Sequence, residues 1–162
     1  MIQQSIQQLN LVSTHVERLR MAMNELASTF PEYNTVMGIY GVRKTYIPQL
    51  IAEIDDVFRF THREALTAFA NVDPSVDKSV QHKSKSNRAS KVDSARLRKT
   101  LFHIMTTLLQ NAPVDDPVYR FLDKKRSAGK PYYVYMTVGA NKFLRIYYVK
   151  VKECLHNLEQ ES

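Results

Sequence analysis

Serines and basic side chains alternate through one stretch near the middle of the chain, residues 73–94, here called the serine-basic loop. Hydroxyls, ammonium groups and guanidinium groups are the side chains that hold phosphate oxygens. We therefore take as candidate phosphate contacts Lys78, Lys83, Lys85, Arg88, Ser90 and Lys91. A segment this polar cannot order itself by burying apolar surface, so we expect it to be mobile until an anion docks. A solvated loop between two helices explains the composition equally well.

Basic residues also follow the loop, at the start of a predicted helix. The apolar spacing of Leu97, Leu101, Ile104 and Leu108 predicts a helix that is capped by Asp93 or Ser94 and ends near residue 111. Its first turns carry Arg96, Arg98 and Lys99, which oppose the helix dipole. This placement costs some stability, so we expect an anionic ligand at these three side chains.

A third group of basic residues lies in a predicted helical hairpin. A short helix over residues 35–40 meets the turn Gly41-Val-Arg43, and a second helix runs through Leu50 and Ile54. The pattern is similar to a helix-hairpin-helix, in which backbone N–H groups at a helix start face a DNA phosphate. Arg43 replaces the second glycine of that pattern, although Arg43 and Lys44 could contact phosphate themselves. An ordinary helical turn is the alternative.

The elements that must position these groups are all predicted to be helical. Residues 1–30 form one helix, because apolar side chains recur every three or four residues on one stripe. The stripe is Ile2, Ile6, Leu9, Val12, Val16, Leu19, Met23, Leu26 and Phe30. Its length and narrow seam indicate a coiled-coil arm. A single amphipathic helix packed on its own domain is the alternative, and either needs a partner surface.

The second half of the chain continues the helical pattern. Thr61 and Glu64 read as a capping box that opens a short helix whose inward residues are Ala65, Leu66, Ala68 and Phe69. Asp116 and Pro117 open the next helix, and a tyrosine-rich helix runs from about residue 131 to residue 158. No strand pattern competes. We predict an all-α fold with a coiled-coil-like helix (1–30) and a compact helical domain (31–158).

Composition narrows the class of partner. The chain has 162 residues and a net charge of +7, which favours a polyanionic partner. It has no apolar run of membrane-spanning length and no signal or lipidation motif, so we expect a cytoplasmic protein without membrane contact. Its single cysteine and scattered histidines form no metal site. The acidic group Glu53, Asp55 and Asp56 has no visible further ligand, so we assign no metal and no cofactor to this chain.

Several segments together resemble a known family. These are PQLIAEIDD, TAFANVDP, LRKTLF and GKPYYVYM…GANKFLRIYY, within residues 30–153. They are similar to the C-terminal half of bacterial transposases of the insertion-sequence 110/116/902 family. The resemblance implies a helical domain that binds DNA and supplies a catalytic serine, which falls here on Ser79.

The chain departs from the family pattern around that serine and elsewhere. The family's Tyr and Gly beside the serine are replaced by Asp77 and Val80, and Asp55 and Asn71 stand where the family has glycine. Glycine permits positive φ and close approach of backbone to phosphate, to which Asp and Val are poorly suited. Lys78 and its basic neighbours in the loop could still support attack on phosphorus.

The resemblance also implies parts that this sequence does not hold. Family members carry an N-terminal domain with four acidic residues (a DEDD set) that bind divalent metal such as Mg²⁺. We therefore expect a truncated or split transposase with little activity alone, and in many relatives a guide RNA takes part. A catalytically inactive nucleic-acid-binding remnant is the first alternative. A regulatory fragment that pairs with itself or with intact transposase through residues 1–30 is the second.

Overall fold

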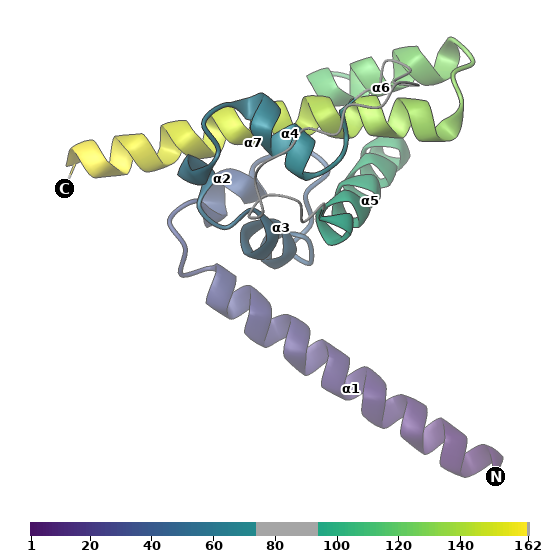
Figure 1. Ribbon diagram of the computed structural model, residues 1–162. Coiled ribbons are helices and arrows are strands. Elements are labelled where there is room, and N and C mark those ends of the chain that lie inside the picture. Colours follow the sequence, from purple (N-terminus) through teal and green to yellow (C-terminus); the bar gives the residue numbers. More distant parts are fainter. Residues whose placement is uncertain (74–93, 162) are drawn as a thin grey trace, which may run out of the picture.

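The computed structural model describes residues 1–73 and 94–161, and the regular structure of this part of the chain is all helical (Figure 1). The predicted all-α class is confirmed. The helices, in chain order with one 3₁₀ turn (η1), are α1 (Ile2–Ala27), α2 (Tyr33–Met37), α3 (Ile47–Ile54), η1 (Val57–Arg59), α4 (Arg63–Phe69), α5 (Ala95–Asn111), α6 (Pro117–Ser127) and α7 (Tyr132–Glu161).

Helix α7 is the axis of the compact part of the molecule. It contacts α2, η1, α4, α5 and α6, and Figure 1 shows it running across the compact part from one end to the other. Its buried residues are Met136, Thr137, Gly139, Ala140, Phe143, Leu144, Tyr147, Tyr148 and Val151. Gly139 lets α6 and α5 come close, because a Cβ there would lie 2.6 Å from Leu122 Cδ1 and 3.0 Å from Met105 Sδ. Tyr147 and Tyr148 belong to the core, whereas Tyr132 and Tyr133 at the start of the helix are exposed.

Helix α1 is built differently. Figure 1 shows it extending away from the compact part, with its C-terminal end beside α3. Only Ala27 of this helix is buried, and the whole predicted apolar stripe is exposed, including Leu9 (65%) and Leu19 (64%). The stripe thus does not pack on the chain's own domain, at least within the described residues. The helix ends at Ala27 rather than at residue 30.

Helix starts follow the predicted caps in two of three cases. Ser94 Oγ accepts from the Leu97 N–H at 3.1 Å, so Ser94 caps α5. Asp116 Oδ1 accepts from the N–H groups of Val118 and Tyr119 and caps α6. The capping-box prediction at Thr61 is wrong, because His62 caps α4 and its Nδ1 accepts from the Ala65 N–H at 3.1 Å.

The burial predicted for α4 also needs one correction. Leu66 is fully buried, and Ala65 and Phe69 are partly buried against the core, as expected. Ala68, however, is exposed, and Thr67 takes the inward position instead. The inward face of α4 is therefore centred on Leu66 and Thr67.

The turn between α2 and α3 holds Gly41 at a positive φ of 83°. A Cβ on Gly41 would come within 2.8 Å of Leu108 Cγ, so this glycine lets the turn pack closely on α5. Helix α3 begins at Ile47, several residues after Arg43, with Pro48 in its first turn. That the amides of this turn bind phosphate stays a prediction.

Candidate nucleic-acid interface

The two described residues that flank the gap at 74–93 are both held beside α4. Asp73 Oδ1 accepts from Thr67 Oγ1 at 2.6 Å and from Asn141 Nδ2 at 3.1 Å. On the other side, the Ser94 N–H donates to the Phe69 carbonyl oxygen at 3.1 Å. Both ends of the serine-basic loop are therefore fixed to the same part of the fold.

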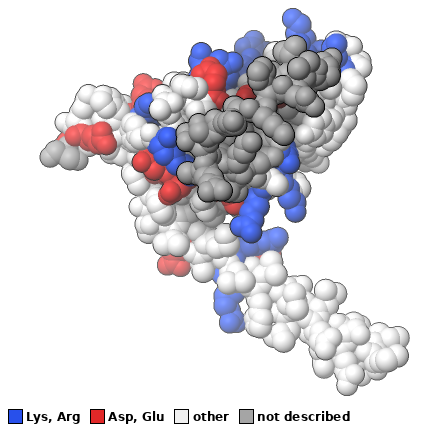
Figure 2. All heavy atoms as spheres, in the orientation of Figure 1, with Lys and Arg blue, Asp and Glu red and all other residues white. Residues whose placement is uncertain are grey.

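A groove with basic walls lies next to Ser94, between α3 and α5, and is here called the α3–α5 groove. It has a volume of about 640 Å³. Helix α5 contributes Arg96, Lys99 and His103, helix α3 contributes Gln49 and Glu53, and α1 adds Arg20. Figure 2 shows blue side chains gathered where α1 meets the compact part.

The hydrogen bonds of the groove fix α3 to the start of α5. Glu53 Oε2 accepts from Ser94 Oγ at 2.7 Å, and Thr100 Oγ1 donates to Gln49 Oε1 at 2.8 Å. Arg96 Nη1 lies 3.9 Å from Glu53 Oε1, but the Arg96 side chain is 89% exposed, so this ion pair contributes little. Arg96 is consequently available to an anionic ligand.

An aromatic pair sits at the same groove. The rings of Tyr46 and His103 are nearly parallel, with centroids 6.1 Å apart and an interplanar angle of 6°. His103 is exposed. Flat exposed rings beside cations are typical of sites that accept nucleic acid, because bases stack on rings while phosphates contact cations.

The structure brings together only part of the predicted basic set. Arg96 and Lys99 share the groove, whereas Arg98, two residues along the helix from Arg96, projects about 200° away around α5. Arg43 and Lys44 are exposed in the turn before α3 and do not line the groove. The remaining predicted contacts lie outside the described residues: Lys78, Ser79, Lys83, Lys85, Arg88, Ser90 and Lys91.

Sequence reasoning missed several groove residues. Arg20, Tyr46, Gln49 and His103 come from three helices or their caps, and none belongs to a motif with the others. Only the helical spacing of Arg96, Lys99 and His103 at i, i+3 and i+7 could have placed His103 on the basic face.

Two of the residues that stand where the family resemblance implies glycine have a positive φ. Asp55 has φ 57° and Asn71 has φ 50°, both in the left-handed half of conformational space. Asn and Asp are enriched among the non-glycine residues with positive φ. Asp55, with ψ −128°, nevertheless lies outside the left-handed helical region that these side chains favour.

The described residues offer no metal centre. Within residues 1–73 and 94–161, no three His, Cys, Asp or Glu side chains are grouped to hold a metal ion. Glu53 is bonded to Ser94, and Asp56 Oδ1 accepts from the Phe58 N–H at 2.8 Å. These residues do not fit a divalent cation, and we derive no catalytic step through one.

The described part of the chain is thus an all-helical domain, and the sequence carries a net charge of +7. Residues 33–120 match the family model described as Transposase IS116/IS110/IS902 family, and this match covers more than half of the chain. The chain therefore belongs to this transposase family, which indicates a role in transposition. No curated protein and no solved structure gave a match. None of the described helices is long and apolar enough to cross a membrane.

Proposed function

We propose that this chain is the DNA-binding C-terminal part of a serine-using DEDD-type transposase. The observation that carries the proposal is the position of Arg96 and Lys99, which line the α3–α5 groove directly after Ser94, where the serine-basic loop returns to the fold. A DNA backbone in this groove would pass next to the base of the loop that holds Ser79. Arg43 and Lys44, in the turn before α3, would add contacts at its edge.

In this proposal Ser79 is the nucleophile. Its Oγ forms a bond to a DNA phosphorus as the bond from phosphorus to a DNA oxygen breaks, and the proton of the serine hydroxyl ends on the leaving oxygen. The phosphoserine ester links protein and strand until a DNA hydroxyl attacks the phosphorus and returns the proton to Ser79. Basic neighbours of the serine would offset the charge that develops on the phosphate. The divalent metal would come from a separate DEDD domain acting in trans, and a guide RNA would select the site as the family resemblance implies.

Helix α1 would supply the association that such an assembly needs. Its exposed stripe is the surface that a coiled coil buries. We propose that it pairs with a second copy of this chain or with an intact transposase. Replacement of Val12 and Val16 with Asp should convert the oligomer to a monomer in sedimentation velocity without lowering the melting temperature of the compact part. An oligomer that survives this change would contradict the pairing.

The DNA-binding proposal is tested by a salt series with short duplex DNA. The plot of log K against log salt has a negative slope, whose magnitude falls by about 0.9 for each lost phosphate contact. Arg96→Ala/Lys99→Ala should therefore reduce this magnitude by roughly 2. The matched control is Lys124→Ala/Lys130→Ala, which removes the same charge from exposed positions outside the groove. Equal slopes for both variants would show that the groove is not the DNA surface.

The catalytic part is tested separately. Ser79→Ala should leave DNA affinity unchanged but abolish a covalent protein–DNA adduct formed after a DEDD domain and Mg²⁺ are added. An adduct that persists in Ser79→Ala would exclude this serine. Binding without any adduct in the wild type would favour the second candidate function, an inactive nucleic-acid-binding remnant.

A further inference from the structure

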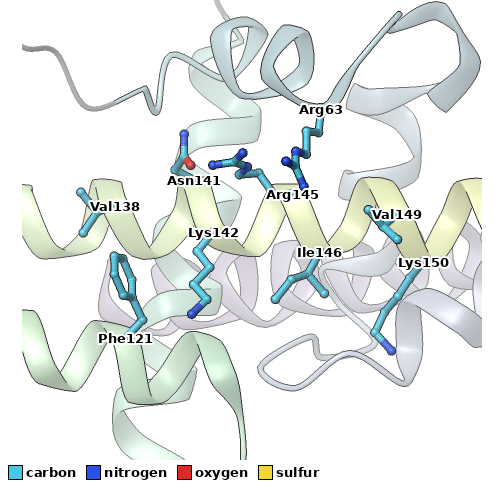
Figure 3. Close-up of a pocket in the computed structure, with 9 residues that line it drawn as sticks. All are labelled: Arg63, Phe121, Val138, Asn141, Lys142, Arg145, Ile146, Val149 and Lys150. Atoms are coloured by element: carbon cyan, nitrogen blue, oxygen red, sulfur yellow. The ribbon is translucent and has the colours of Figure 1, made fainter.

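A second groove runs along the outward face of α7, between α4 and α6, and is here called the α7 groove (Figure 3). It has a volume of about 720 Å³. It shares no lining residue with the α3–α5 groove. No motif in the sequence pointed to it.

The floor of the α7 groove is apolar. Val138, Ile146 and Val149 of α7 line it together with Phe121 of α6. These three aliphatic residues of α7 lie on one face of the helix. Val149 is 50% exposed, and Val138 and Ile146 are only partly buried. An exposed aliphatic strip on a helix that already buries its other face indicates a surface that a partner covers.

The sides of the groove are cationic. Figure 3 shows Arg63 and Arg145 on one side of α7, and Lys142 and Lys150 on the other. Glu64 lies between the two arginines, and its Oε1 accepts from Arg63 Nε at 3.0 Å and from Arg145 Nη2 at 2.8 Å. The pKa of the Glu64 carboxyl is held below its ordinary value. The largest cause is a backbone hydrogen bond, followed by the hydrogen bond from Arg63 and the charges of both arginines.

The lysines of the groove have no such acid. Lys142 Nζ lies 4.8 Å from the ring centroid of Phe121, so its stem continues the apolar floor. Neither Lys142 nor Lys150 forms an ion pair with an acid within residues 1–73 and 94–161. Besides Glu64, two acids lie near the groove: Asp73, which bonds Asn141 at one end, and Glu153, which follows Lys150 by three residues on α7. With these three acids against four cations, a small excess of positive charge remains, on the lysine side of the apolar strip.

We propose that the α7 groove binds an amphipathic helix of a partner protein, with an apolar stripe flanked by Asp or Glu. The stripe would lie on Val138, Ile146 and Val149, and the acids would meet Lys142 and Lys150. Eleven residue steps from Val138 to Val149 correspond to roughly 16 Å, or about three turns of the bound helix. A nucleic-acid backbone fits less well, because phosphates would lie over an aliphatic floor that offers them no hydrogen bonds.

Segments of this chain do not have the required chemistry. The serine-basic loop carries more cations than acids and would be repelled. Helix α1 carries Glu17 and Glu25 against Arg18 and Arg20, so a second copy of it lacks the acidic flanks. The proposal does not depend on DNA binding at the α3–α5 groove.

The test uses the full chain and three labelled helical peptides of about 14 residues that share a Leu stripe at i, i+4, i+7 and i+11. Their flanking residues are all Glu, all Gln or all Lys. We expect the Glu peptide to bind at least tenfold more tightly than the Gln peptide in fluorescence anisotropy. Lys142→Glu/Lys150→Glu should weaken the Glu peptide at least tenfold and make the Lys peptide the better ligand.

Two further variants keep the result specific. Ile146→Asp should abolish binding of the Glu peptide, whereas Lys124→Glu/Lys130→Glu, the same charge change outside the groove, should leave it unchanged. Circular-dichroism melting curves confirm that each variant is folded. The proposal is overturned if the Glu and Gln peptides bind alike. It is equally overturned if Lys142→Glu/Lys150→Glu weakens duplex DNA binding and leaves peptide binding unaffected, because the groove is then a nucleic-acid surface.

Discussion

The two long helices, α1 and α7, have similar apolar periodicity but differ in how much of the apolar face is buried. They contain 26 and 30 residues, and both repeat apolar side chains at helical spacing. Helix α1 buries Ala27 alone, whereas α7 buries nine residues, among them Phe143 and Tyr147. Periodicity therefore indicates which face of a helix is apolar, but it does not indicate what covers that face.

The small residues of α7 explain part of the difference. Gly139 leaves room for Leu122 of α6 and Met105 of α5, so three helices meet closely around it. The apolar stripe of α1 consists of large side chains, and only the C-terminal part of the helix, from about Arg20, lies beside α3. A helix that is held near one end leaves most of its stripe exposed.

The largest effect that separates the two helices is expected from truncation of an apolar side chain. Phe143→Ala removes a fully buried ring and should lower the free energy of unfolding by about 3–5 kcal/mol. Leu19→Ala, at an exposed position of α1, should change it by less than about 0.5 kcal/mol in the monomer. Urea unfolding measures both, and equal losses would contradict the contrast.

An enlarged side chain tests the close packing at Gly139. Gly139→Val places atoms against Leu122 and Met105 and should cost about 1–3 kcal/mol in the same urea assay. The matched change Ala22→Val adds a similar side chain to an exposed site on α1 and should cost only its helix propensity, roughly 0.5 kcal/mol. A Gly139→Val variant as stable as Ala22→Val would show that the helices need no small residue there.

Alkaline pH distinguishes the buried middle of α7 from its exposed start. Burial first, and then the charge of Glu32, raise the pKa of Tyr147 well above its usual 10.0. The folded state therefore holds the Tyr147 proton to a higher pH than the unfolded state does. The contribution of this group to the free energy of unfolding is fully present below pH 10 and is lost as the pH rises above it. The slope is about 1.4 kcal/mol per pH unit.

The slope is assigned by two phenylalanine variants. Tyr147→Phe should remove it from a plot of unfolding free energy against pH, whereas Tyr132→Phe, at an exposed position, should leave it in place. If both variants keep the full slope, another group is responsible for the alkaline loss.

The smallest expected change in the free energy of unfolding concerns the end of α3, the helix that α1 contacts. Asp55 is exposed and holds φ 57° and ψ −128°, a region that glycine occupies without strain. Asp55→Gly should therefore raise the free energy of unfolding by about 0.5–1 kcal/mol. The control Ser28→Gly, at the end of α1 with φ −66°, relieves no strain and should be neutral or slightly destabilising. Thermal melts of the two variants, compared with the wild type, provide the check.

Sequence reasoning located most helices and part of the candidate site. Apolar spacing predicted α1, α5, α6 and α7, and the Asp116–Pro117 pair marked the start of α6 correctly. The start of α4 was placed one residue early, because the nitrogen of His62 caps the helix in place of the hydroxyl of Thr61. Local patterns do not decide between two neighbouring side chains that can both accept a hydrogen bond.

The basic positions were harder to group. Arg96, Arg98 and Lys99 are adjacent in the chain, but only Arg96 and Lys99 face the α3–α5 groove, since helix geometry turns Arg98 away. The aromatic pair Tyr46–His103 joins residues from two helices and has no sequence motif. The α7 groove, likewise, combines Arg63 of α4 and Phe121 of α6 with the outer face of α7.

The sequence by itself determined the helical class, the basic character and the membership of a transposase family, because periodicity, charge and motifs are local properties of the chain. The tertiary structure decided which helix is core and which is exposed, and which cations share a groove. It also decided that Asp55 and Asn71 take a positive φ. These outcomes depend on contacts between residues far apart in the sequence, whose free energies no local pattern contains.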